Sequence, residues 1–237
     1  MTKLPPNYLS VQQNTPEWVV ARIGHVTASR VADVVAKLKS GKESAARSSY
    51  KLELLTETLT GRAAEHYVSR EMDFGTENEP LARTCYELKL GVEVERVGYV
   101  LHPKIPRSGC SPDGLVGDEG LVEFKVPNTT THLQYFIDGV VPDDYKPQMN
   151  WQMACTGRKW VDFVSYDPRL PEEFGLFIVR FERDDKVIGE MEREVECFIK
   201  ELNAMAEKLL EKKRVVTRPT ALEESSLPDD SWLRASS

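Results

Sequence analysis

The sequence lacks the features that would place the protein in several specialised classes. Its 237 residues include four cysteines, Cys85, Cys110, Cys155 and Cys197, and these form no Cys-x-x-Cys pair. We therefore expect reduced thiols in a cytosolic protein, and neither a disulfide framework nor a zinc knuckle. The four histidines show no ligand spacing either, which also argues against a zinc site.

Long apolar segments are absent as well. No run approaches the roughly 18 residues that a membrane-spanning helix needs, and residues 1–13 lack the apolar core of a secretory signal. The composition is otherwise ordinary, 41% hydrophobic and 29% charged, with 14 glycines and 14 prolines. It excludes collagen-like, low-complexity and mostly disordered chains, and it predicts no membrane association. The length suits one substantial domain or at most two small ones.

The chain has fewer basic than acidic residues, and this imbalance is uneven along it. Lys and Arg total 31 against 38 Asp and Glu, a net charge of −7, which taken whole argues against a nucleic-acid binder. Residues 1–62, however, contain nine Lys and Arg against five Asp and Glu, a net charge of +4. A basic N-terminal quarter on an acidic body permits a nucleic-acid partner that the average conceals.

The hydrophobic periodicity predicts a single α/β domain, with a central mixed β-sheet flanked by helices. Residues 215–237 are rich in Pro, Ser and acidic residues without an apolar period, so we expect a flexible acidic tail. The domain would then cover residues 1–214, with a basic helical part at 1–62, a core at 63–183 and a long helix at 186–214. The other helices are expected at 15–22, 27–38, 50–60, 76–90, 130–139 and 143–156, the strands at 92–102, 121–126, 160–166 and 176–181, and a polar loop at 40–47.

Three charged residues are expected to converge at an edge of the sheet. Glu123 and Lys125 alternate along a predicted strand and so share one face. Asp113 lies in the turn Ser-Pro-Asp-Gly that precedes this strand, with nine residues between it and Glu123. A Pro-Asp-Gly turn alone is common, and a Glu-x-Lys pair is usually a solvated charge pair. Their combination, in this order and on an otherwise apolar strand, favours an active site.

These groups suit the hydrolysis of a phosphodiester. Mg²⁺ prefers oxygen ligands, which Asp113, Glu123 and the backbone carbonyl of Phe124 can supply. One or two such ions polarise the phosphate and activate a water molecule. Lys125 would orient or deprotonate that water and offset charge on the phosphate in the transition state.

Arg22, Thr27 and Ser29 form a second candidate cluster. The start of the helix predicted at 27–38 would offer free backbone N–H groups to a phosphate, and Arg22 could bind the same phosphate through two hydrogen bonds. The alternative is a helix cap beside a surface arginine, and the residues alone do not decide between them. Trp18 fits a core anchor better than a platform for base stacking.

The ordered set of motifs resembles one family. The spacing Pro-Asp-x9-Glu-x-Lys matches the PD-(D/E)xK nuclease motif. Around it, Ala-Arg-Ile-Gly-His-Val-Thr-Ala-Ser at 21–29, Gly-Thr-Glu-Asn-Glu at 75–79, Cys-Ser-Pro-Asp-Gly-Leu at 110–115 and Tyr-Asp-Pro-Arg at 166–169 occur in the order found in the phage lambda exonuclease, or YqaJ-like viral recombinase, family. The resemblance covers roughly residues 15–183.

The resemblance implies roles for further residues. Glu79 matches an additional acidic residue near a second metal ion, and we prefer it to its neighbour Glu77 by position. Gln148 matches a helical glutamine of the last catalytic motif, although from the sequence alone it would be taken for a surface amide. Ser111 joins the second cluster in binding the 5′-terminal phosphate of the degraded strand. The family's residues at Asp113, Glu123 and Lys125 are the metal-binding carboxylates and the catalytic lysine.

The family's properties then become expectations for this protein. The protein would then be a magnesium-dependent exonuclease in which Mn²⁺ can substitute and each site holds two ions. It would digest one strand of double-stranded DNA from its 5′ end and leave 3′ overhangs. The enzyme would form a ring-shaped homotrimer around DNA and act with a single-strand annealing protein in recombination. It would be encoded by a phage or prophage and act in the bacterial cytoplasm.

Three alternatives remain open from the sequence. One is a PD-(D/E)xK nuclease of the RecB or Cas4 kind with a different polarity, although the scattered cysteines do not suit the iron–sulfur cluster of the latter. The second is a catalytically silent module that binds DNA ends. The third is an acidic scaffold in which the two motifs are coincidental.

Overall fold

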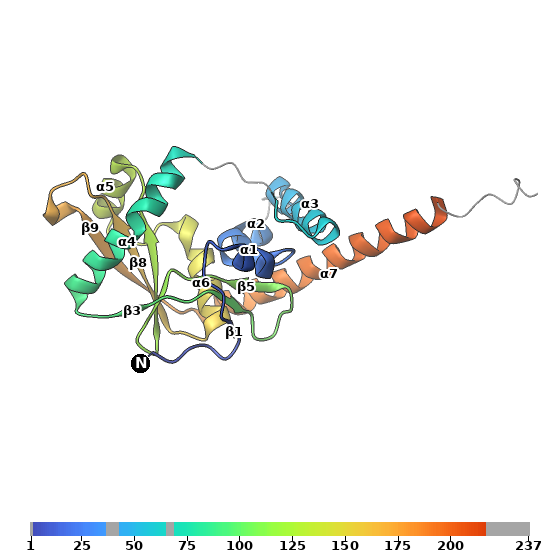
Figure 1. The fold of residues 1–237 in the computed structure, drawn as a ribbon, viewed down its shortest axis with the longest axis horizontal. Coiled ribbons are helices and arrows are strands. Elements are labelled where there is room, and N and C mark those ends of the chain that lie inside the picture. The colour runs from blue at the N-terminus through green and yellow to red at the C-terminus, as the bar shows by residue number, and fades with distance from the viewer. Residues whose placement is uncertain (1, 37–42, 65–68, 217–237) are drawn as a thin grey trace, which may run out of the picture.

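The computed structural model describes residues 2–36, 43–64 and 69–216, which fold around two mixed β-sheets (Figure 1). The larger sheet has the order β3-β6-β7-β8-β9, in which β7 and β8 are parallel and the other neighbours antiparallel. Its strands are β3 (Val94–Glu95), β6 (Gly114–Val116), β7 (Gly120–Lys125), β8 (Trp160–Tyr166) and β9 (Leu176–Glu182). The smaller sheet has the order β1-β4-β5-β2, with β1 (Tyr8–Leu9), β4 (Tyr99–Leu101), β5 (Ser108–Cys110) and β2 (Val26–Thr27).

Helices cover both faces of the larger sheet. Helix α4 packs on one face, and α5 and α6 pack on the other. The helices of the described residues are α1 (Pro16–Arg22), α2 (Val31–Val35), α3 (Ala45–Thr60), α4 (Arg70–Leu90), α5 (Thr129–Asp138), α6 (Lys146–Thr156) and α7 (Asp185–Val216), with short 3₁₀ turns at Ala28–Arg30, Asp143–Tyr145 and Glu172–Phe174. On β7, Val122 and Phe124 join the apolar cluster beneath α4, whereas Leu121 joins the core that contains α6. Because alternate residues of a strand face opposite sides, Glu123 and Lys125 point to the α6 side.

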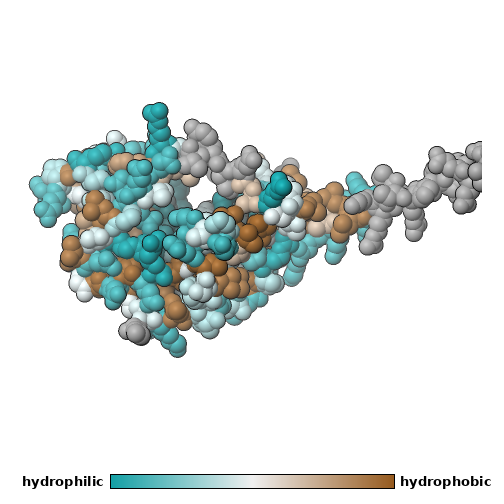
Figure 2. All heavy atoms as spheres, viewed as in Figure 1, coloured by the Kyte–Doolittle hydropathy of each residue, from teal (hydrophilic) through white to brown (hydrophobic). Residues whose placement is uncertain are grey.

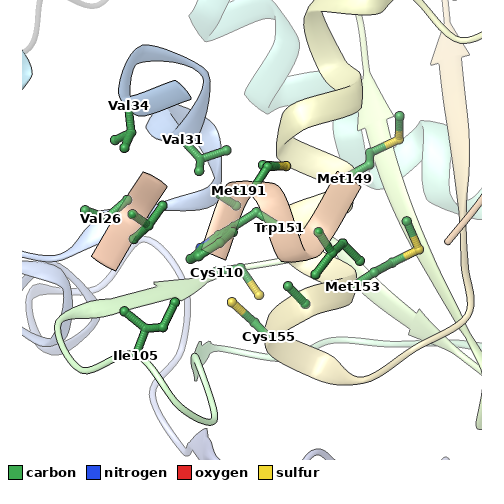
Figure 3. Packing of buried hydrophobic residues seen from close by; sticks show 14 of the residues in the cluster. Val26, Val31, Val34, Ile105, Cys110, Met149, Trp151, Met153, Cys155 and Met191 are labelled. Carbon is green, nitrogen blue, oxygen red and sulfur yellow. The ribbon is translucent and has the colours of Figure 1, made fainter. Parts of the chain in front are cut away.

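The main core lies between α6, α7 and the smaller sheet. Figure 3 shows Met149, Trp151 and Met153 of α6 packed among side chains from the other elements, and all three are fully buried. Helix α6 packs against β5, β8 and α7, so it is held from several directions. This rigid support matters because α6 also faces the charged residues of β7.

The helix ends follow from local capping residues. Ser44 accepts a hydrogen bond from the backbone N–H of Arg47 and begins α3, and Ser69 does the same for α4 through Met72. Both helices end at a glycine with positive φ, Gly61 at 66° and Gly91 at 64°. These caps explain why α3 begins at Ala45, inside the segment expected to be a loop, and why α4 begins six residues before position 76.

Two other predicted elements were wrong in their extent. The helix expected at 27–38 is a 3₁₀ turn followed by the short α2, because Thr27 pairs with Gly109 as part of β2; residues 37 and 38 lie outside the described part. The strand expected at 92–102 is split into β3 and β4, which belong to different sheets. Between them Gly98 lies so close to the Val11 carbonyl that a side chain at this position would clash.

Helix α7 extends far beyond the rest of the structure (Figure 1). Apolar residues interrupt the hydrophilic surface near its base and along its length (Figure 2), and Leu209 and Leu210 are exposed there. Within the described ranges, no helix combines the length and apolar character required to cross a bilayer. Of the predicted acidic tail, only residues 215 and 216, at the end of α7, belong to the described residues.

Candidate active site

The hairpin formed by β6 and β7 brings the three predicted charged residues together. Asp113 directly precedes β6, and the pairing of Gly114 with Val122 places it beside the end of β7. Its Oδ2 accepts a hydrogen bond of 2.7 Å from the backbone N–H of Phe124. Lys125 Nζ donates to Glu123 Oε1 at 2.5 Å. The structure thus brings Asp113, Glu123 and Lys125 into one cluster, as their spacing predicted.

Helix α6 closes this cluster from the other side. Gln148 donates from Nε2 to Glu123 Oε1 at 2.5 Å, so it lies in the site and is not a free surface amide. Gln152, one turn later, donates from Nε2 to Glu123 Oε2 at 2.6 Å. Gln152 was not anticipated from the sequence, although its four-residue spacing from Gln148 places both on one helix face. Glu123 is therefore buried, with 1% of its surface exposed.

The charges in the cluster shift one another's pKa values. Burial raises the pKa of Asp113 well above its usual range, and the negative charges of Glu123 and Glu79 raise it further. Burial alone would lower the pKa of Lys125, but Glu123 and Asp113 outweigh that effect and raise it. The two carboxylates thus favour the ammonium form of Lys125, which donates a hydrogen bond to Glu123.

Glu79 lies on α4 at the edge of the cluster. Its carboxylate pairs with Arg83 Nη2 at 3.0 Å, one turn further along the helix, and its charge acts on Asp113. Glu77, the alternative, is exposed and falls two residues away on another part of the helix surface. The arrangement favours Glu79 of the two. Arg83, whose guanidinium lies over the ring of Phe124, was not anticipated from the sequence.

The donor set fits a hard divalent cation. Within the part of the chain that the structure describes, no three His, Cys, Asp or Glu side chains converge as a ready metal site. Two carboxylates with the Phe124 carbonyl nevertheless offer the oxygen ligands that Mg²⁺ prefers. Burial and the charges of Glu123 and Glu79 raise the pKa of Asp113, and a bound cation would offset both effects.

Three of the four predicted phosphate-binding residues line a separate cavity of about 560 Å³. They are Arg22, Thr27 and Ser29, and the Thr27 and Ser29 hydroxyls lie 3.3 Å apart. The Arg22 Nε is buried without a hydrogen-bond partner among the described residues. The helix N-terminus expected here is only a 3₁₀ turn before the five-residue α2, so its dipole is weak and the side chains are the main polar groups.

Ser111 and Trp18 connect this cavity to the turn that holds Asp113. Ser111 does not line the cavity, but the indole N–H of Trp18 donates to its Oγ at 2.8 Å. The Arg22 guanidinium stacks 3.8 Å from the Trp18 ring centre. Trp18 is thus half-buried between Arg22 and Ser111, and the prediction of a core anchor was wrong. The sequence gives no signal for this contact, because 93 residues separate its partners.

A mixed sheet that presents Asp113 and the Glu-x-Lys strand in this way defines a protein of the PD-(D/E)xK nuclease class. The family model for the YqaJ-like viral recombinase domain matches residues 17–159, more than half of the chain. The chain belongs to the YqaJ-like viral recombinase family.

Solved structures agree with this assignment. The alkaline exonuclease LHK-Exo from Laribacter hongkongensis shares 48% sequence identity over 85% of this chain and 100% of its own, with a TM-score of 0.80. The same values hold for LHK-Exo in complex with dAMP. A phage-related exonuclease from Haemophilus somnus is 15% identical over 78% of this chain and 96% of its own, with a TM-score of 0.63, and shows the fold alone. The comparison with curated protein sequences gives no match.

Proposed function

We propose that the protein is a metal-dependent exonuclease that digests one strand of double-stranded DNA from the 5′ end and leaves a 3′ single-stranded overhang. The observation that carries the proposal is the cluster of Asp113, Glu123 and Lys125 on one hairpin, with the Arg22 cavity linked to its loop through Trp18 and Ser111. The 48% identity with an alkaline exonuclease supports the reaction class.

The protein's own residues account for binding and charge at the reacting phosphate. The Lys125 ammonium donates to Glu123 and is 26% exposed, so it can orient a water molecule and stabilise negative charge on the phosphate. Gln148, on the facing helix α6, is a second half-buried donor to Glu123. One or two Mg²⁺ or Mn²⁺ ions would be held by Asp113, Glu123 and the Phe124 carbonyl, with Glu79 nearby. When bound, the metal supplies Lewis-acid polarisation of the phosphate.

The Arg22 cavity accounts for the choice of strand end. A terminal 5′ phosphate carries an extra negative charge, and the unpartnered Nε of Arg22 with the Thr27 and Ser29 hydroxyls supplies donors for it. Ser111 would add a hydroxyl from the turn that holds Asp113. A terminal phosphate bound in this cavity would fix the position of the strand end. It would thereby determine which phosphodiester bond lies at the cluster of Asp113, Glu123 and Lys125.

The same proposal extends to the assembly. Residues 1–214 would form the exonuclease unit, three copies would enclose DNA as a ring, and a single-strand annealing protein would take over the exposed strand, in the cytoplasm of a phage-infected or lysogenic bacterium. Membership in a family of viral recombinases supports the role in recombination. The ring and the annealing partner are what the family resemblance implies. Sedimentation equilibrium should then give a mass three times the chain mass of 26.9 kDa, and a monomer mass would contradict the ring.

Linear and closed circular duplexes of the same sequence test the proposal, each incubated with and without Mg²⁺. We expect loss of the linear duplex only when Mg²⁺ is present, while the circle stays intact. Binding to ends without hydrolysis would support a silent end-binding module instead. Internal cuts in the circle would show an endonuclease.

A further inference from the structure

In the described part of the chain, Gln152 is the one side chain that donates a hydrogen bond to Glu123 Oε2. Its Nε2 donates at 2.6 Å, and the whole residue is buried with 0% of its surface exposed. The other donors, Lys125 and Gln148, both approach Oε1 and are themselves partly exposed. The two oxygens of this carboxylate are therefore held by different groups from different environments.

The orientation of the Gln152 amide is fixed by its partner. A carboxylate oxygen can only accept, so the NH₂ end of the amide must face Glu123. The Gln152 Oε1 is then left buried without a hydrogen-bond partner in the described residues. A buried, unpaired carbonyl is costly, and an apolar side chain of similar size would avoid that cost. Packing alone does not explain a glutamine at this position.

Helix α6 gives Gln152 a rigid base. Its neighbours Trp151 and Met153 are fully buried in the main core (Figure 3), and the helix packs against α7 and the smaller sheet. The donor atom is consequently fixed relative to β7. By contrast, rotation about the last torsion of a glutamate is intrinsically broad, so Glu123 needs an external contact to define the plane of its carboxylate.

We propose that Gln152 is a positioning residue for Glu123. It holds Oε2 so that Oε1 stays directed at Lys125 and at the side where metal and phosphate would bind. This inference rests on the proposed function of Glu123 as a metal ligand. Contacts of this kind, one step removed from the ligand atoms, typically change metal affinity or activity by about 10- to 100-fold when they are removed.

The test replaces Gln152 by methionine, which is unbranched and of similar length but cannot donate. Gln152→Met removes an unpaired buried carbonyl but also leaves Glu123 Oε2 without its donor, so the two effects on stability oppose each other and we expect only a small change in melting temperature. Its kcat should fall about 10- to 100-fold with little change in KM for DNA. Isothermal titration of Mn²⁺ into the protein without DNA should show a comparable loss of affinity, which a structural role elsewhere would not produce.

Two further variants keep the result interpretable. Gln134→Met makes the same exchange at an exposed site on α5 and should change neither quantity. If Gln152→Met does not fold, Gln152→Asn keeps the amide but is one methylene too short, and the same loss of Mn²⁺ affinity is expected. Wild-type kcat and Mn²⁺ affinity in a folded Gln152 variant would overturn the inference. A wild-type protein that binds Mn²⁺ but digests no DNA would overturn the proposed function instead.

Discussion

Lys125 shows how neighbouring charges decide what a single residue can do. Its partial burial alone would favour the neutral amine, yet the adjacent Glu123 and Asp113 raise its pKa. The sequence left two roles open, orienting water or removing its proton. The two carboxylates favour its ammonium form, which can donate hydrogen bonds and stabilise negative charge. A cation bound by the same carboxylates would weaken this effect, so the site is compatible with both roles.

Lys125→Ala should abolish digestion while DNA binding survives. The change removes the ammonium next to the reacting phosphate but no residue of the Arg22 cavity, and we expect the rate to fall by about 10²- to 10⁴-fold. Digestion of linear duplex and a separate binding assay in Ca²⁺ measure the two properties. Lys159→Ala, at an exposed lysine beside β8, is the matched control. Digestion by Lys125→Ala at a rate near that of the wild type would contradict the assignment.

The 5′ phosphate should control how fast digestion begins. A charge-assisted hydrogen bond is worth about 1.5–3 kcal/mol, so removing the substrate's 5′ phosphate should slow the wild type by roughly 10- to 100-fold. In Arg22→Ala the rates on phosphorylated and unphosphorylated ends should approach each other. Arg193→Ala on the exposed surface of α7 should keep the wild-type ratio. Equal wild-type rates on both ends would mean that the cavity is wrongly assigned.

Among individual residues, the sequence could predict those that lie close together in one motif. Asp113, Glu123 and Lys125 could be predicted because a turn and a strand of fixed period bring them together within 13 residues. The contacts of Trp18 with Ser111 and of Gln152 with Glu123 span 93 and 29 residues. They depend on how separate elements pack, and no local pattern encodes that.

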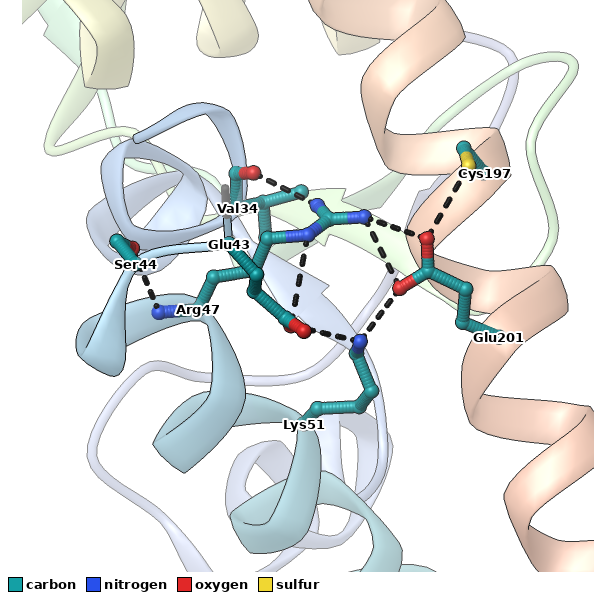
Figure 4. Close-up of polar contacts among 7 residues, drawn as sticks. All are labelled: Val34, Glu43, Ser44, Arg47, Lys51, Cys197 and Glu201. Atoms are coloured by element: carbon teal, nitrogen blue, oxygen red, sulfur yellow. Dashed lines mark hydrogen bonds and ion pairs between the residues drawn. The ribbon is translucent and has the colours of Figure 1, made fainter. Parts of the chain in front are cut away.

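Among the elements, α3 and α7 are joined by a network of charges (Figure 4). Arg47 Nη2 and Lys51 Nζ of α3 reach the two oxygens of Glu201 on α7, at 3.0 and 2.5 Å. Burial raises the pKa of Glu201, but hydrogen bonds from Lys51 and Cys197 and the charge of Arg47 outweigh it, so the pKa is lowered. Both cations are largely buried, which makes their shared carboxylate important for docking α7.

Glu201→Gln should destabilise the protein by about 1–2 kcal/mol at pH 7. This is less than the cost for a fully buried pair, because the Glu201 side chain is 39% exposed. A carboxylate whose folded pKa is lowered stabilises above its unfolded pKa of about 4.3 and loses that contribution as the pH falls through the folded value. The gap between wild type and variant in urea unfolding should therefore shrink below about pH 4.

Glu211→Gln, at an exposed position on the same helix, controls for the loss of a surface charge. It should change the free energy of unfolding little at either pH. A Glu201→Gln variant as stable as the wild type at pH 7 would show that the network does not hold α7 in place.

The limits of element prediction have a common physical cause. Strand β8 was predicted with correct bounds, because it is buried on both faces and apolar residues therefore recur on each face along its sequence. The segment at 92–102 looked like one strand by its alternation, yet it leaves one sheet and enters another around Gly98. The helix starting at 27 was lost because pairing of Thr27 with β5 outweighed its tendency to cap a helix.

For the whole molecule, net charge is a poor guide to the partner. The value of −7 includes Asp113, Glu123 and Glu79, which gather at the proposed active site instead of lying scattered over the surface. The net charge of +4 in residues 1–62 includes Arg22 of the proposed phosphate cavity; Lys37, Lys39 and Lys42 lie outside the described residues. The distribution of charge, and not its sum, is compatible with DNA.

The polarity of digestion tests the central claim most directly. Linear duplex DNA carrying a 5′ phosphate, labelled either at the 5′ or at the 3′ end of one strand, would be digested with Mg²⁺ and sampled over time. The account predicts that the 5′ label is released first as a mononucleotide, while the 3′-labelled strand shortens progressively from its other end. Release of the 3′ label first would contradict it.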